Sequence, residues 1–153
     1  MIKFISIFSI LLITTIAIES TPFSDIGNGT VTDTGTKLIW QKCTEGQDVL
    51  TCEGEAAQMN YSQANIYCAN LQLANKKWRL PKREEISGLL DLTSKDEYSK
   101  IDTSVFPKTV AYRFWSSTPT NSNETVMWTT HFYYGEEKRT KKIDKGYARC
   151  VAM

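Results

Sequence analysis

The chain has little of what metal-binding and nucleic-acid-binding proteins need. It contains a single histidine, His131, and no Cys-x-x-Cys pair, so the usual spacing of zinc ligands is missing. Its 18 Lys and Arg residues are nearly balanced by 17 Asp and Glu residues, which leaves a net charge of +1. A nucleic-acid-binding domain carries a strong excess of basic residues. We therefore expect no metal, no cofactor and no nucleic-acid partner.

Long apolar segments are also scarce, and the one that is present lies at the N-terminus. It runs from Phe4 to Ile18, directly after Lys3 and Ile2 near the start of the chain. At about 15 residues it is shorter than the roughly 20 that a membrane-spanning helix needs. The pattern predicts a signal peptide over residues 1–20 and a single domain over residues 21–153. An uncleaved N-terminal anchor is the alternative. We expect an exported protein, periplasmic, cell-surface or secreted, that meets the membrane only through this leader.

The sequence contains four cysteines, and the leader decides which chemistry suits them. In an oxidising compartment cysteines form disulfides, whereas in a reducing cytosol they serve as metal ligands or nucleophiles. Three pairings of four cysteines are possible, and the sequence alone does not choose among them. We favour Cys43 with Cys52 and Cys68 with Cys150, because this choice pairs the two local cysteines and leaves no odd thiol.

Strand and turn patterns occupy both ends of the predicted domain. Residues 23–42 contain two short alternating segments around the turn at residues 33–36, which predicts a hairpin. The C-terminal third contains turn residues at Gly135 and at 144–146 and predicts further strands between them. These strands are expected over residues 112–116, 126–133, 138–143 and 147–152.

Helical periodicity lies between these strand-forming ends. The apolar stripe of an amphipathic helix runs from Ala64 to Leu71, with Asn60 or Ser62 as the N-cap. A second short helix is expected after Pro81, with two glutamates in its first turn. Its apolar face would consist of Ile86, Leu89 and Leu90. We therefore predict an α+β domain in which two helices lie between antiparallel strands.

Six sequence blocks, in this order and spacing, resemble one known family. The blocks are Gly29-Thr30-Val31-Thr32-Asp33-x-x-Thr36-x-Leu38-x-Trp40-Gln41-Lys42-Cys43, Ala64-x-x-Tyr67-Cys68, Trp78-Arg79-Leu80-Pro81-x-x-x-Glu85, Ile101-Asp102-x-x-x-Phe106-Pro107, Trp115-Ser116-Ser117-Thr118 and Arg149-Cys150-Val151. Together they resemble the Lcl C-terminal domain family, long known only as a domain of unknown function. The resemblance covers essentially all of residues 21–153.

The resemblance carries expectations of its own about fold and function. It implies a C-type-lectin-like α+β fold, distantly related to that of formylglycine-generating enzymes. It also implies a disulfide between the first helix and the last strand, which here corresponds to Cys68 and Cys150. The adhesin that gives the family its name is a trimeric cell-surface protein that binds sulfated glycans. Adhesion, glycan binding and oligomerisation are therefore the properties that the resemblance implies.

A cluster of basic residues near the C-terminus is the strongest candidate binding surface. Its members are Lys138, Arg139, Lys141, Lys142 and Lys145. If residues 138–143 form a strand, Lys138 and Thr140 face one side, while Arg139 and Lys141 face the other. An anionic polysaccharide would be held there by charge pairing that weakens with salt. The alternative is a solvated hairpin whose charges keep the protein soluble and protect an edge strand.

The block at residues 115–118 is a second candidate binding surface. Trp115, Ser116 and Ser117 end a predicted strand and could present a ring and two hydroxyls to a sugar. The alternative is a structural strand end capped by serines. The Trp78-Arg79-Leu80-Pro81 block is expected to be structural, with its two apolar side chains in the core and its arginine paired with a carboxylate. His131 is expected to be a hydrogen-bonded structural histidine, since no acid or nucleophile accompanies it in sequence.

These observations predict an exported, non-enzymatic binding module. Its expected partner is an anionic or sulfated glycan, or a protein surface of a host or an envelope. A structural envelope or secreted protein that self-assembles is the alternative. An oxygenase related to formylglycine-generating enzymes fits less well, because such enzymes use two reduced cysteines to hold copper, and a disulfide has no free thiolate.

Overall fold

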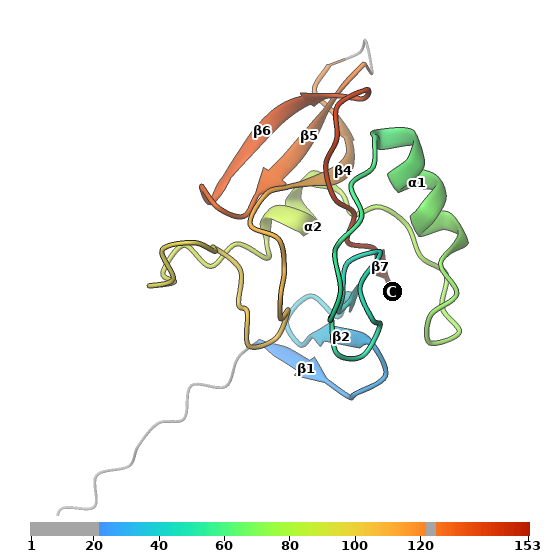
Figure 1. Cartoon of the computed structure of the whole chain (residues 1–153), viewed down its shortest axis with the longest axis vertical. Coiled ribbons are helices and arrows are strands. Elements are labelled where there is room, and N and C mark those ends of the chain that lie inside the picture. The colour runs from blue at the N-terminus through green and yellow to red at the C-terminus, as the bar shows by residue number, and fades with distance from the viewer. Residues whose placement is uncertain (1–21, 122–124) are drawn as a thin grey trace, which may run out of the picture.

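A computed structural model describes residues 22–121 and 125–153, which form two antiparallel sheets and two short helices (Figure 1). The predicted α+β class is therefore confirmed. The predicted signal peptide, residues 1–20, lies outside the described residues. Within the described ranges no helix is both long enough and apolar enough to cross a membrane.

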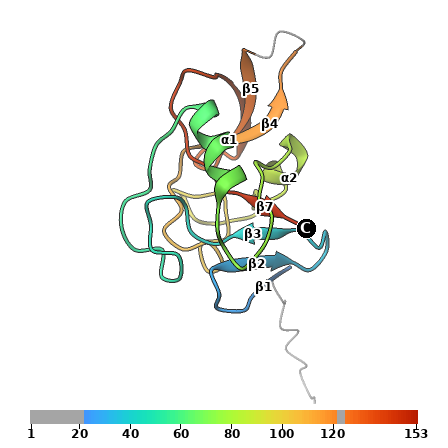
Figure 2. The same ribbon diagram turned by 90° about the vertical axis from the view of Figure 1, so that its right-hand side faces the viewer.

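The first sheet contains both ends of the described chain. Its strand order is β1 (Phe23–Asp25), β2 (Thr30–Asp33), β3 (Ile39–Gln41) and β7 (Val151–Ala152). The predicted hairpin is present as β2 and β3, because Asp33 Oδ1 accepts hydrogen bonds from the Gly35 and Thr36 amides and closes the turn. Figure 2 shows β1, β2, β3 and β7 side by side at one end of the molecule, with β4 and β5 at the other.

The second sheet has the order β4 (Arg113–Pro119), β5 (Val126–His131) and β6 (Glu136–Lys141). It matches three of the predicted strands with shifted ends. Residues 132–135 form the turn between β5 and β6, so β6 begins earlier and ends earlier than predicted. The Gly135 amide donates to the His131 carbonyl at 2.9 Å, and Gly135 has a φ of +68°. Glycine adopts this left-handed conformation without a steric cost.

The predicted final strand, residues 147–152, forms only in part. Tyr147 makes an isolated parallel bridge with Phe114, and the strand proper starts at Val151. Between these points the Cys150 amide donates to the Gln41 side chain at 3.1 Å rather than to a neighbouring strand. A side-chain acceptor therefore interrupts the ladder that the sequence pattern predicts.

The two helices cover opposite faces of the second sheet. Helix α1 (Tyr61–Asn70) starts at the predicted N-cap Asn60, whose Oδ1 accepts from the Gln63 amide at 3.0 Å while Gln63 Oε1 accepts from the Asn60 amide at 2.9 Å. This reciprocal pair satisfies two amides that a helix end leaves free. Helix α2 (Arg83–Ser87) starts just after Pro81 and buries Ile86.

Two hydrophobic clusters follow from this arrangement. The α1 cluster joins Cys68, Trp78 and Leu80 to Trp115 and Met127 of the second sheet. The α2 cluster joins Ile86 and Phe114 to Val31 and Trp40 of the first sheet, together with the Phe106 loop. The Trp78-Arg79-Leu80-Pro81 block is structural as predicted, because Arg79 makes a two-point ion pair with Glu85 at 2.7 and 2.8 Å.

Two disulfides contain all four cysteines of the chain, and both match the favoured pairing. Cys43 and Cys52, with Cα atoms 4.9 Å apart, close the loop between β3 and α1. Cys68 and Cys150, with Cα atoms 5.4 Å apart, attach α1 to the residue before β7. Disulfides of this kind persist in oxidising environments and indicate one for this protein.

Candidate binding site

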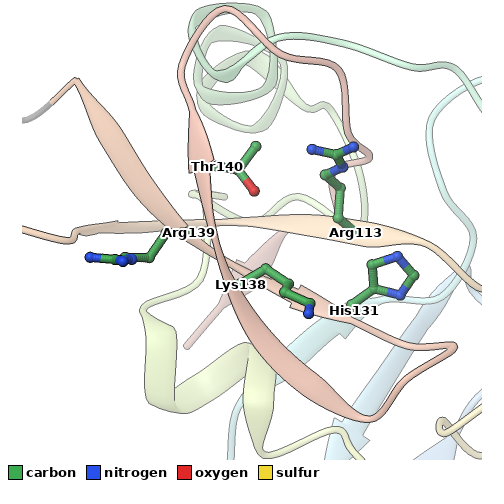
Figure 3. Close-up of a pocket in the computed structure, with 5 residues that line it drawn as sticks. All are labelled: Arg113, His131, Lys138, Arg139 and Thr140. Carbon is green, nitrogen blue, oxygen red and sulfur yellow. The ribbon is translucent and has the colours of Figure 1, made fainter.

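A cavity of about 200 Å³ opens on the β4–β5–β6 sheet near the turn between β5 and β6. Strand register explains which side chains meet there: Arg113 lies opposite His131, and Lys138 and Thr140 alternate with Arg139 along β6. Figure 3 shows Arg113, His131 and Lys138 gathered on one side of the sheet, while the guanidinium of Arg139 points away from them. We call the cavity that Arg113, His131, Lys138, Arg139 and Thr140 line the basic cavity.

Three basic side chains line the basic cavity, namely Arg113, Lys138 and Arg139. The Arg113 guanidinium lies 4.7 Å from the centre of the Tyr112 ring and also donates to the Tyr112 hydroxyl. No carboxylate of the described residues lies within 4 Å of it. Lys138 Nζ lies 2.6 Å from Glu136 Oε1, and both side chains are about half exposed. The residues that line the cavity therefore include three basic side chains and no carboxylate, and Glu136 pairs with one of the three, Lys138.

His131 supplies a buried polar atom to the same cavity. Only 8% of the residue is exposed, and among the described residues its Nδ1 has no hydrogen-bond partner. Burial lowers the pKa of His131 from 6.5, the Arg113 and Lys138 charges lower it further, and Glu136 acts in the opposite sense. The imidazole is therefore neutral at pH 7. The expectation that His131 is a fully hydrogen-bonded structural histidine is wrong at Nδ1.

The structure distributes the predicted basic cluster over three places. Lys138 and Arg139 both line the basic cavity, although they lie on opposite faces of β6, as the predicted alternation requires. Lys141 is exposed and lies on the same face of β6 as Arg139. Lys142 and Lys145 follow the end of β6 and reach toward α1. Lys142 Nζ lies 4.8 Å from the centre of the Tyr61 ring, and Lys145 Nζ donates to Gln63 Oε1 at 3.1 Å.

A smaller cavity of about 160 Å³ brings two other predicted residues together. Ser117 and Lys142 line it with Tyr61, Pro119 and Met127. Ser117 Oγ already donates to the Pro81 carbonyl at 3.1 Å, so its hydroxyl proton is engaged within the fold. Lys142 alone contributes a charge to this second cavity.

The structure corrects the ligand contact expected from Trp115 and Ser116, because both residues are fully buried. Trp115 Nε1 donates to the Met59 carbonyl at 3.0 Å, and its ring meets the edge of the Tyr61 ring under α1. Ser116 Oγ donates to the Trp128 carbonyl at 2.7 Å. The physical reason is that β4 continues to Pro119, so the block lies inside the sheet instead of ending a strand.

Sequence reasoning missed Arg113 and Tyr134. Arg113 joins the site only through its register with His131, which no local pattern reveals. Tyr134 is 62% exposed, and its ring centre lies 4.6 Å from that of His131. The available signal was the Tyr133-Tyr134-Gly135 turn, where two aromatic residues precede a turn glycine.

The described residues were also searched for metal ligands and free thiols. They contain no group of three His, Cys, Asp or Glu side chains able to hold a metal ion. All four cysteine sulfurs are in disulfides, so the described residues contain no thiolate. The fold and the site thus define a disulfide-crosslinked α+β domain with a basic cavity on one sheet.

Comparison with known proteins places this domain in a family. The family model of the Lcl C-terminal domain matches residues 29–152, so the chain belongs to that family. The match begins at Gly29, between β1 and β2, and extends through β7. A search of the curated proteins found no match.

Proposed function

We propose that this protein is an exported, non-enzymatic binding module for anionic polysaccharide. The observation that supports it most is a set of basic side chains on and after β6 that are exposed or half-buried and lack a carboxylate partner among the described residues. Arg139 and Lys141 have no carboxylate of the described residues within 4 Å, and the same holds for Lys142 and Lys145. The two disulfides support export, and the family membership supports a C-type-lectin-like form of the α+β fold.

The binding would rest on many weak charge pairs. Each exposed ion pair contributes little, at about 0–1 kcal/mol, but a polymer engages several at once. Salt screens such exposed pairs, and the screening length at physiological ionic strength is about 8 Å. The proposal therefore predicts affinity that falls steeply as salt is raised, without any chemical change to the bound glycan.

The first experiment measures retention of residues 21–153 on an immobilised sulfated polysaccharide and the salt needed to elute them. The test variant is Lys141→Glu with Lys142→Glu. The matched control is Lys76→Glu with Lys77→Glu, which makes the same charge change at two exposed residues between α1 and Trp78. We expect only the first variant to elute at clearly lower salt. Failure of the wild-type domain to bind, or equal losses in both variants, would overturn the proposal.

Self-assembly through the exposed edge of β6 is the second candidate. The sheet order β4-β5-β6 leaves β6 at an edge, where a further strand could pair. The charges along β6 oppose such pairing, because like charges placed directly opposite are destabilising. Sedimentation of the same domain over a range of concentrations separates the two proposals, since only self-assembly predicts a concentration-dependent mass in the absence of glycan.

A further inference from the structure

We infer that the basic cavity binds the acidic group of one sugar residue, and that the ring of this sugar stacks on Tyr134. The inference rests on the proposed function and names the part of the polysaccharide that is recognised. The acidic group is a carboxylate or a sulfate, since both present several acceptor oxygens and a negative charge. Arg113, His131 and Lys138 would hold it, since all three line this cavity (Figure 3).

The residues that line the cavity carry an excess of positive charge. Arg113 has no carboxylate partner among the described residues, and a guanidinium offers several donors in a planar arrangement that suits an acidic group. Its position is fixed by its contact with the Tyr112 ring. A charge held in place in this way binds an anion without the cost of ordering a free side chain.

Nδ1 of His131 is buried and has no hydrogen-bond partner among the described residues. Buried polar side-chain atoms nearly always have a hydrogen-bond partner, so an exception calls for an explanation. An oxygen of a bound acid would supply the missing partner of Nδ1 when that nitrogen carries a proton. Thr140 also lines the cavity, and its Oγ1 shares a hydrogen bond of 2.9 Å with Thr129 Oγ1.

An exposed aromatic ring, that of Tyr134, lies beside two residues of the cavity, His131 and Lys138. Tyr134 contacts His131 through their rings, and Lys138 Nζ lies 5.6 Å from the centre of the Tyr134 ring. The residue is nevertheless 62% exposed. The turn that carries it is held by Gly135, where a Cβ atom would come within 3.0 Å of Leu92 Cδ2. A positioned, exposed ring beside two cations suits an acidic sugar, which has an apolar ring face and a charged substituent.

Glu136 would compete with the acidic group of the ligand for Lys138. The Glu136 carboxylate lies 2.6 Å from Lys138 Nζ, where an acid of the ligand would bind. Glu136 and Lys138 alternate with Glu137 on β6 and share one face of the strand. Replacing this carboxylate by its neutral amide should free Lys138 and strengthen binding.

The experiment is titration calorimetry of residues 21–153 with three oligosaccharides of equal length: an unsulfated oligouronate, a sulfated oligosaccharide without uronate, and a neutral one. Binding of either acidic oligosaccharide but not of the neutral one supports the inference and identifies the acid. We expect Glu136→Gln to tighten this binding by about two- to fivefold. Glu55→Gln, the same charge change at an exposed residue outside the cavity, should leave it within about twofold.

Tyr134→Ala tests the stacking separately. It should weaken binding by about fivefold, whereas Tyr98→Ala, at a residue with 67% exposure, should not. Wild-type affinity in both Tyr134→Ala and Lys138→Gln would overturn the inference. If Lys141→Glu with Lys142→Glu still weakens binding in that case, the proposed function survives and only the location is wrong. Absence of binding by the wild-type domain would overturn both.

Discussion

Arg113 lies directly opposite His131 across β4 and β5, so that a permanent positive charge and the only imidazole of the chain share one face of the sheet. Lys138 and Glu136 of β6 lie on the same face of the sheet as this imidazole. The rings of Tyr112 and Tyr134 pack against it. Burial disfavours the charged imidazolium, and two neighbouring cations disfavour it further. The basic cavity is thus arranged to accept a negative charge from outside.

The first prediction concerns stability and pH. The pKa of His131 is lower in the folded protein than its unfolded value of 6.5, so the unfolded chain binds more protons as the pH falls below that value. The free energy of unfolding should therefore decrease from about pH 7.5 to about pH 5.5. Urea denaturation at both pH values should show that the free energy of unfolding decreases less in His131→Gln than in the wild-type protein. The same decrease in both proteins would show that His131 does not titrate as argued.

The second prediction concerns affinity and pH. A bound acid favours the imidazolium and raises the pKa of His131, so binding takes up a proton. Affinity for the acidic oligosaccharide should therefore increase as the pH falls through the same range. His131→Gln should bind with an affinity that does not change with pH. Lys141→Gln, which removes a charge of β6 outside the basic cavity, is the control and should keep the pH dependence.

The third prediction concerns the two disulfides. Cys68–Cys150 spans a sequence separation of 82, and Cys43–Cys52 a separation of 9. Because crosslinking restricts the unfolded chain more for longer loops, Cys68→Ser with Cys150→Ser should cost about 4 kcal/mol, and Cys43→Ser with Cys52→Ser about 2–3 kcal/mol. Urea denaturation of the two double variants measures both costs. A larger loss at the short loop would contradict the expected order.

The fourth prediction concerns Arg149, which is fully buried beside Cys150. Its guanidinium donates to the Gln41 carbonyl at 2.8 Å, to Thr109 Oγ1 at 2.7 Å and to the Lys42 carbonyl, and it packs on the Phe106 ring. Burial lowers the pKa of Arg149 to about 9, so the side chain is charged at pH 7.

Because an ammonium cannot reproduce this planar set of donors, Arg149→Lys should lower the free energy of unfolding by about 3 kcal/mol. The exposed change Arg139→Lys is the matched control and should cost less than about 0.5 kcal/mol. Thermal or urea denaturation measures both. Equal stability of the two variants would mean that the donors of Arg149 contribute little.

Local chemistry explains which parts of the fold could be predicted from the sequence. The β2–β3 turn and the start of α1 depend on side-chain acceptors a few residues away, Asp33 and Asn60, and both were predicted. The family resemblance and the favoured cysteine pairing agreed on the Cys68–Cys150 bridge, and the structure contains it.

The binding site was predicted less well because it depends on strand register. Lys138 was named with its neighbours in sequence, but the sheet also places it with Arg113 and His131, which belong to other strands. Ser116 resembled the polar end of a strand, yet the Trp128 carbonyl satisfies its hydroxyl inside the sheet. Both results follow from pairing between distant segments, which short sequence patterns do not contain.

The most direct test of the account is the pKa of His131 with and without an acidic oligosaccharide. His131 is the only histidine of the chain, so its imidazole signals in an NMR titration need no assignment. The account predicts a pKa below 6.5 in the free domain and a clear rise when the oligosaccharide saturates it. An unchanged pKa at saturation would show that the acidic group binds elsewhere and would contradict the account.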